Sequence, residues 1–293
     1  MTEQKTPGSR RITVVEVGPR DGLQNESAQV PTAAKVAFVE ALADAGLPVV
    51  EATSFVSPAA VPQLADADEV MRAIRRRPGM RYPVLVPNER GLERALAAGV
   101  EAITLFTAAT EAFAQANVRA SIAETFARFT PVAARARSER LWLRGYVSVA
   151  FDDPYSGRVE PKAAVAVAHR LFDLGCDEVS LADTIGTATP EDVARLVAVA
   201  LRELPADRLA LHFHDTGGRA LDNVGVGLDY GIKVFDSAAG GLGGCPFAPG
   251  APGNLATERL IAFLHERGIE TGVDLAGVER AVATLRGTLA SAA

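Results

Sequence analysis

The chain has 293 residues, of which 48% are hydrophobic and 23% are charged, and its formal net charge is −6. Because nucleic-acid-binding proteins usually carry a basic field, this acidic balance predicts no nucleic-acid partner. Two cysteines and the absence of any run of about 18 apolar residues exclude a disulfide scaffold and predict no membrane span.

Short β-branched runs alternate along the chain with stretches rich in alanine and leucine. The runs predict strands at residues 12–17, 49–55, 82–86, 103–106, 143–149, 178–181, 209–213 and 234–237. The stretches that follow them predict helices at residues 31–45, 62–77, 90–98, 121–140, 161–174, 190–204, 220–230 and 255–267. Eight strand–helix units favour an α/β fold with a parallel sheet closed into a single (β/α)8 TIM barrel, rather than an open doubly wound sheet. A last stretch, 273–290, predicts one additional C-terminal helix on the outside.

Residues that favour helix ends support these boundaries. A glycine falls between a predicted helix and the next strand four times, at Gly46, Gly99, Gly175 and Gly231, where a left-handed cap belongs. Thr189 precedes the helix at 190–204 as a candidate N-cap.

The whole chain, residues 1–293, is expected to form one catalytic domain. No linker rich in proline, glycine or serine divides it. The N-terminal segment MTEQKTPGSRR lacks the apolar core of a secretory signal, so we expect a cytoplasmic protein in which about residues 1–10 are disordered.

Polar residues gather after the predicted strands, at the end where a barrel of this kind assembles its site. The clearest pair is His212 and His214, which are two residues apart in a strand and therefore share one face. Together with the oxygens of Asp21 and Asn254 they would satisfy a hard divalent ion. The His-x-His spacing alone leaves open the alternative of two hydrogen-bonded interior histidines.

Cys245 lies in the glycine-rich sequence GLGGCP, after the last predicted strand. Beside a metal and an arginine, a thiol would have its protonation tuned toward acid–base chemistry. The alternative is a small buried hydrophobe, which is our prediction for Cys176. The loop does not fit a dinucleotide-binding motif, because no helix opens on a G-x-G-x-x-G spacing.

Six segments together resemble the 3-hydroxy-3-methylglutaryl-CoA (HMG-CoA) lyase family of the DRE-TIM metallolyases. They are VEVGPRDGLQNE (15–26), EATSFVSP (51–58), RGYVS (144–148), SLADTIG (180–186), HFHDT (212–216) and GLGGCPFAPGAPGNLATE (241–258). The resemblance implies retro-Claisen cleavage of HMG-CoA to acetyl-CoA and acetoacetate with Mg²⁺ or Mn²⁺. It also implies an acyl-CoA partner, a homodimer and a role in leucine degradation.

The resemblance assigns roles to residues at matching positions. It implies metal ligands at Asp21, His212, His214 and Asn254, and catalytic or supporting residues at Arg20, Glu51, Asp183 and Cys245. It implies substrate contacts at Arg20, Gln24, Ser54 and Ser180, and places Glu258 in the same motifs.

Three departures from the family pattern concern acyl-group specificity. After HDT the family commonly has a tyrosine, whereas this chain has Gly217. After the fifth strand the family has a Gly-Cys-Pro stretch, whereas this chain has Asp152 and Asp153. After Asn25 and Glu26 the family often has a basic residue, whereas this chain has Ser27. Space at Gly217 predicts that the site accepts a bulkier C3 substituent. The remaining alternatives are a Claisen-type condensing enzyme and a non-catalytic acyl-CoA-binding barrel.

Overall fold

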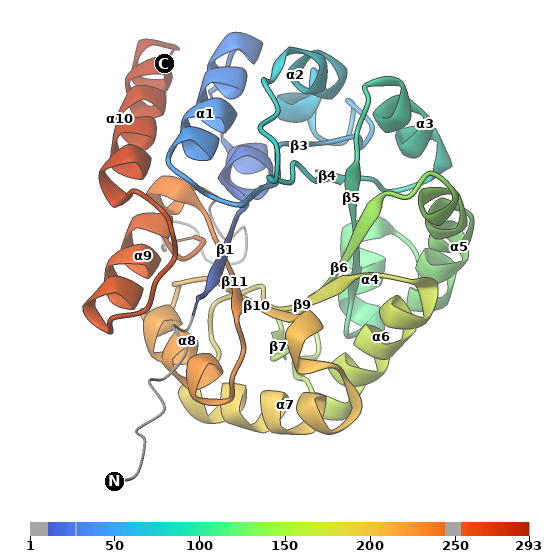
Figure 1. Ribbon diagram of the computed structural model, residues 1–293. Coiled ribbons are helices and arrows are strands. Elements are labelled where there is room, and N and C mark those ends of the chain that lie inside the picture. The colour runs from blue at the N-terminus through green and yellow to red at the C-terminus, as the bar shows by residue number, and fades with distance from the viewer. Residues whose placement is uncertain (1–10, 27, 244–252, 293) are drawn as a thin grey trace, which may run out of the picture.

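The strands of the computed structural model form one parallel sheet that curls into a ring surrounded by helices (Figure 1). The described residues are 11–26, 28–243 and 253–292, so the expectation of disorder at residues 1–10 falls outside them. The sheet contains β1 (Thr13–Glu16), β2 (Val49–Val50), β3 (Thr53–Ser54), β4 (Val84–Leu85), β5 (Ala102–Ala108), β6 (Trp142–Ser148), β9 (Glu178–Asp183), β10 (Leu209–Phe213) and β11 (Val234–Ser237).

The sheet closes because β2 and β3 are two parts of one extended segment. On one side the Glu51 amide donates to the Glu16 carbonyl at 2.8 Å, next to β1. On the other side the Ala52 amide donates to the Pro83 carbonyl at 2.9 Å, next to β4. With β2 and β3 counted together, eight parallel strands complete the ring, which confirms the predicted (β/α)8 barrel.

Helices surround the ring, as Figure 1 shows. They are α1 (Thr32–Asp44), α2 (Ala67–Ala73), α3 (Glu89–Ala97), α4 (Glu111–Val118), α5 (Ile122–Ser138), α6 (Pro161–Leu174), α7 (Pro190–Glu203), α8 (Ala220–Asp229), α9 (Thr257–Glu266) and α10 (Leu275–Ala292). The predicted additional C-terminal helix is α10, which packs against α1 and α9. Within the described ranges, no helix has the length and apolar character needed to cross a bilayer.

The predicted N-cap at Thr189 and the four predicted cap glycines are confirmed. Thr189 caps α7, where its hydroxyl and the Asp192 carboxylate each accept a hydrogen bond from the other residue's amide. The four predicted cap glycines all have positive φ, between 69° and 98°.

Three local features differ from the prediction. Helix α2 is shorter than expected, because the chain becomes extended at Ile74, where the guanidinium of Arg76 bonds carbonyls of Met71 and Ala98 instead. Helix α4 and the hairpin of β7 (Asp152–Asp153) and β8 (Gly157–Arg158) were not predicted.

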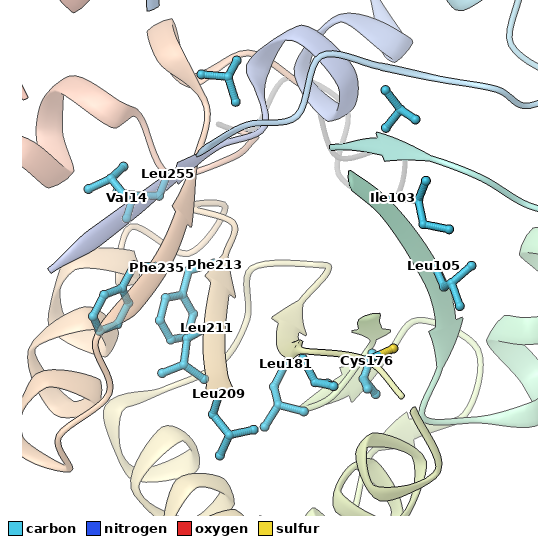
Figure 2. Packing of buried hydrophobic residues seen from close by; sticks show 14 of the residues in the cluster. Val14, Ile103, Leu105, Cys176, Leu181, Leu209, Leu211, Phe213, Phe235 and Leu255 are labelled. Carbon is cyan, nitrogen blue, oxygen red and sulfur yellow. The ribbon is translucent and has the colours of Figure 1, made fainter. Parts of the chain in front are cut away.

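Two layers of apolar side chains follow from the alternation of side chains along each strand. The larger layer lies between strands and helices; Figure 2 shows Leu209, Leu211 and Phe213 of β10 on that outer side. It also contains Cys176, which is fully buried, as predicted. Inside the barrel a smaller cluster includes Ala210, and the next inward residue of β10 is His212.

Candidate active site

A cavity of about 1140 Å³ opens at the carboxyl ends of the strands. Its walls come from the turn after β1, from β3 to β6, from β9 and β10, and from α4, α5 and the β7–β8 hairpin. The polar side chains on its inner wall include those of Arg20, Asp21, Ser54, His212 and His214. The unpredicted α4 and the hairpin therefore build the outer wall of the cavity.

A tight turn places Arg20 and Asp21 at the mouth. The Val17 carbonyl accepts hydrogen bonds from the amides of Arg20 and Asp21, at 3.1 and 2.7 Å. The side chain of Glu16 accepts from the Gly18 amide at 2.7 Å, and a Cβ on Gly18 would lie only 2.6 Å from that carboxylate oxygen. Only glycine fits at this close approach.

Two carboxylates hold the guanidinium of Arg20. Its Nη2 lies 2.8 Å from Glu51 Oε2, and its Nη1 lies 2.7 Å from Asp21 Oδ1. Glu51 is fully buried and accepts hydrogen bonds from Thr104 at 2.6 Å and from Tyr146 at 3.1 Å. The buried Nε of Arg20 has no hydrogen-bond partner among the described residues. One N–H of a fixed cation therefore remains available beside the cavity.

Asp21, His212 and His214 form a cluster that could hold a metal ion. One ligand atom of each residue lies within 4.8 Å of the others. Asn254 completes the group: its Nδ2 donates to Asp21 Oδ2 at 2.8 Å, while its Oδ1 is buried without a hydrogen-bond partner in the described structure. A buried carbonyl oxygen that lacks a donor beside a carboxylate and two imidazoles fits a divalent cation.

The charges in this cluster favour cation binding. Burial alone would raise the pKa of Asp21, but Arg20, His212 and His214 outweigh it and lower the pKa to about 2. Burial, together with His212, lowers the pKa of His214 to about 4. At neutral pH Asp21 is therefore ionised and His214 is uncharged, with a ring-nitrogen lone pair available to a cation.

The predicted substrate contacts lie at different depths. Gln24 and Ser54 both line the cavity, and Gln24 also donates to Asp21 Oδ1 at 3.0 Å. Ser180 is fully buried below the cavity, where its hydroxyl donates to Asp236 at 2.9 Å. Ser180 is not among the described lining residues, so the geometry does not support the predicted substrate contact.

Asp183 was predicted to be catalytic, but its side chain points away from the cavity. Its neighbours Ala182 and Thr184 line the cavity, whereas its carboxylate accepts from the backbone amides of Thr187 and Ala188, at 3.2 and 3.1 Å. Because side chains alternate along a strand, Asp183 faces the opposite side and fixes the following loop.

The expected space at Gly217 does not belong to the cavity. Gly217 is exposed, is absent from the described lining residues, and donates its amide to the Gly186 carbonyl at 2.9 Å. Asp152 and Asp153 accept hydrogen bonds from Thr187 and from the Thr110 and Ser156 hydroxyls, and neither lines the cavity. The structure thus removes the volume argument for a bulkier C3 substituent.

Cys245 lies outside the described residues, so its catalytic role stays a prediction. Gly243, two residues before it, is described and packs closely against Asn254: a Cβ there would lie 2.7 Å from the Asn254 amide nitrogen. Glu258, from the same motif, accepts the Gly240 amide through both carboxylate oxygens, at 2.8 and 3.1 Å.

Three interior residues were not assigned from the sequence: Arg144, Tyr146 and Asp236. All are buried, and they connect the Arg20 and His212 sides of the site. A charged residue inside a strand otherwise made of apolar residues was the available signal, since burying an ion is costly unless a partner compensates it.

The raised pKa of Glu16, which lies beneath the turn, predicts that the stability of the protein depends on pH. Burial raises its pKa from 4.5 to about 7, despite hydrogen bonds from Thr257 and two backbone amides. Because the folded-state pKa is the higher one, this group's contribution to stability is complete below about pH 4.5 and is lost as the pH rises through 7. In Glu16→Gln the free energy of unfolding should therefore fall less as the pH rises, by on the order of 3 kcal/mol.

Urea unfolding at about pH 5 and about pH 8 measures the effect. Asp183, whose pKa burial also raises to about 7, is present in both proteins and cancels in the comparison. An equal loss of unfolding free energy between the two pH values in wild type and Glu16→Gln would contradict the assignment.

The fold and this site together define a (β/α)8-barrel enzyme with a candidate divalent-cation centre at the carboxyl ends of its strands. The HMGL-like family model matches residues 11–284, and the chain belongs to this family.

Individual relatives of the chain are HMG-CoA lyases, in agreement with the family model. The mitochondrial hydroxymethylglutaryl-CoA lyase of Rattus norvegicus is 51% identical over 91% of this chain and 82% of its own length. The crystal structure of the HMG-CoA lyase from Brucella melitensis is 51% identical, with a TM-score of 0.93 over 95% of this chain and 99% of that one. An HMG-CoA lyase from Acinetobacter baumannii, solved with coenzyme A and 3-methylmalate, is 38% identical, with a TM-score of 0.92 over 97% of this chain and 93% of that one.

Proposed function

We propose that this chain is a carbon–carbon lyase that cleaves HMG-CoA to acetyl-CoA and acetoacetate. Family membership and similarity to HMG-CoA lyases over nearly their whole length support this activity. The observation in the site that carries it is the buried guanidinium of Arg20, held by two carboxylates with its Nε free of protein partners in the described structure.

The reaction needs two kinds of help. A base removes the proton of the C3 hydroxyl, the C2–C3 bond breaks, and C3 becomes the ketone of acetoacetate. The electron pair of the broken bond moves onto the thioester oxygen of the acetyl-CoA enolate, which is then protonated at C2. The site must therefore accept a proton and stabilise a developing negative charge.

Arg20 stabilises the enolate oxygen. Because Glu51 and Asp21 hold its Nη atoms, the guanidinium is oriented before substrate arrives and needs little reorganisation as charge develops. Cys245, by its family resemblance, moves a proton during cleavage.

Asp21, His212, His214 and Asn254 would hold a divalent cation, and we propose Mg²⁺ or Mn²⁺. Such an ion supplies Lewis-acid chemistry, which lowers the pKa of a hydroxyl bound to it. Asp21 has a second task, because its Oδ1 contacts Arg20 and its Oδ2 accepts from Asn254. The same carboxylate therefore fixes the cation site relative to the enolate site.

Incubation of the purified protein with a panel of 3-hydroxyacyl-CoA thioesters and Mg²⁺ tests the function. We expect release of acetyl-CoA from HMG-CoA, with less from homologues that carry a longer C3 substituent. Release only from longer homologues would restore the bulkier-substrate alternative. Binding without release would indicate a non-catalytic barrel, and net condensation of acetyl-CoA with a keto acid in place of cleavage would indicate a synthase.

Arg119, on the outer wall, is expected to bind a phosphate of the coenzyme. It ends α4 with φ 51° and ψ 42°, a left-handed conformation that costs a non-glycine residue about 1–2 kcal/mol. Its guanidinium has no hydrogen-bond or ion-pair partner among the described residues, although it lines the cavity. A cation kept at that position without a protein partner suits an anionic ligand.

Arg119→Ala should therefore raise the KM for HMG-CoA about tenfold and leave kcat nearly unchanged, as loss of uniform binding does. Arg140→Ala is the matched control, since Arg140 also has a positive φ, 60°, but precedes β6 at the opposite end of the barrel. Equal KM values for the two variants would disprove a role for Arg119.

The remaining expectations stay proposals. We propose a single domain, a homodimer, a cytoplasmic location and a role in leucine degradation. Analytical ultracentrifugation and cell fractionation would test the second and third.

A further inference from the structure

Below the cavity, the interior of the barrel contains an ion pair to which the proposed reaction gives no role. Arg144 of β6 and Asp236 of β11 are both fully buried, and Arg144 Nη2 lies 2.6 Å from Asp236 Oδ1. Arg144 Nη1 also donates to Asp236 Oδ2 at 3.3 Å, so the pair is bidentate. Glu178, at the end of the barrel away from the cavity, accepts from Arg144 Nε at 2.6 Å.

One arm of this pair reaches His212. In the sheet His212 pairs in register with Asp236, and both side chains face the interior. Asp236 Oδ2 lies 3.3 Å from His212 Nδ1, although the ring is not aligned closely enough for a hydrogen bond. The hydroxyl of Ser180 donates to the same oxygen at 2.9 Å and fixes its position.

The other arm reaches Arg20. Arg144 Nη1 donates to the Tyr146 hydroxyl at 2.6 Å, and that hydroxyl donates to Glu51 Oε2 at 3.1 Å. The same Glu51 oxygen lies 2.8 Å from Arg20 Nη2. In the described interior, Arg144 is thus the one cation that contacts both Asp236, the neighbour of His212, and Tyr146, the neighbour of the Glu51–Arg20 pair.

Stability alone does not account for this arrangement. Well-packed apolar residues usually stabilise a buried position as well as an ion pair does, because desolvation offsets the Coulombic attraction. The neighbouring part of the interior is in fact apolar, with Val15, Val49 and Val234 among its members. An ion pair that instead contacts both halves of the site points to a positioning role.

We propose that Arg144 and Asp236 form a positioning centre that sets the orientation of His212 toward the cation and, through Tyr146, that of Arg20 toward the enolate. This inference rests on the proposed function, because it assigns the two arms to the cation and enolate sites. Neither residue lines the cavity in the described structure, so they act through others.

The two arms can be separated with Asp236→Asn and with the double variant Arg144→Met/Asp236→Leu. Asp236→Asn keeps the shape but removes the charge beside His212, and should weaken Mn²⁺ binding 10- to 100-fold, the range expected for such outer contacts. Saturating Mn²⁺ should then restore most of kcat. In the double variant both arms are lost, so saturating Mn²⁺ should leave kcat still reduced, by about tenfold or more.

Electron paramagnetic resonance of Mn²⁺ without substrate measures the affinity, and steady-state kinetics at saturating Mn²⁺ measures kcat and KM. The double variant removes both charges and should remain folded even if Asp236→Asn does not. Lys35→Met is the control: it breaks another ion pair, in which Nζ of the buried Lys35 lies 2.7 Å from Oδ1 of the partly exposed Asp66, in the helical layer. It should lower the melting temperature without changing Mn²⁺ affinity.

Unchanged Mn²⁺ affinity and kcat in the folded double variant would overturn the inference. So would an equal loss of affinity in Lys35→Met, since general destabilisation would then explain both. Failure of the wild type to bind Mn²⁺ or cleave HMG-CoA is a different result, which overturns the proposed function itself.

Discussion

Removal of divalent ions by exhaustive chelation is expected to abolish cleavage of HMG-CoA, and Mg²⁺ or Mn²⁺ should restore it. Beside Asp21, the Nδ1 atoms of His212 and His214 and the Oδ1 of Asn254 are buried without hydrogen-bond partners in the described structure. Without a cation the C3 hydroxyl would keep its ordinary high pKa.

Turnover before and after chelation, with elemental analysis of the same samples, measures this dependence. The melting temperature of the chelated protein is the control, because a folded but inactive protein separates chemistry from unfolding. Full activity in a protein shown to be free of metal would refute the cation site.

Cys245→Ser should lower kcat by about 10²-fold or more, the range for loss of a group that transfers a proton. The matched variant, Cys176→Ser, should leave kcat nearly intact. Cys176 is fully buried between strands and helices, and burial raises the pKa of its thiol to about 12, so it stays protonated and out of reach of substrate. Replacing it should cost some stability through its contact with the helical layer.

Single-turnover and steady-state rates of both variants, with their melting temperatures, distinguish the two roles. If both variants lost the same activity, Cys245 would be supporting the structure and not the reaction.

The fold was predictable because each barrel strand is a short β-branched run followed by a helix with recognisable ends. The strand predicted at 209–213 matches β10 residue for residue. Local sequence signals were insufficient where tertiary contacts decide the end of a helix. Helix α2 ends early because the Glu40 side chain accepts a hydrogen bond from the Arg75 amide, and the Arg76 guanidinium donates to the Ala98 carbonyl at the end of α3. Helix α4 was missed because its alanines and polar residues lack apolar periodicity, although Thr110 caps it.

In the candidate site, sequence reasoning succeeded where chain order alone determines position. His212 and His214 share a face because side chains alternate along a strand, and Asp21 meets them because it follows β1 at the same, carboxyl end of the barrel strands. The roles given to Asp183 and Ser180 ignored side-chain direction and depth. Alternation places Asp183 on the other face, and Ser180 lies one inward residue below the lining residue Ala182.

The network around Asp236 could not be predicted, since it depends on which strands are neighbours. Arg144 and Asp236 are 92 positions apart and lie on non-adjacent strands of the ring. Only the closed barrel brings them into contact across its interior.

Cleavage of HMG-CoA carrying ¹³C at C1 and C3, followed by NMR, tests the proposed reaction most directly. With Mg²⁺ the wild type should move the C1 label into the acetyl-CoA thioester and the C3 label into the ketone of acetoacetate, in equal amounts. Asp21→Ala, which removes a proposed cation ligand and a partner of Arg20, should form neither product at a measurable rate. Intact HMG-CoA after incubation with folded, metal-loaded wild type, or undiminished cleavage by Asp21→Ala, would contradict the proposed reaction and its site.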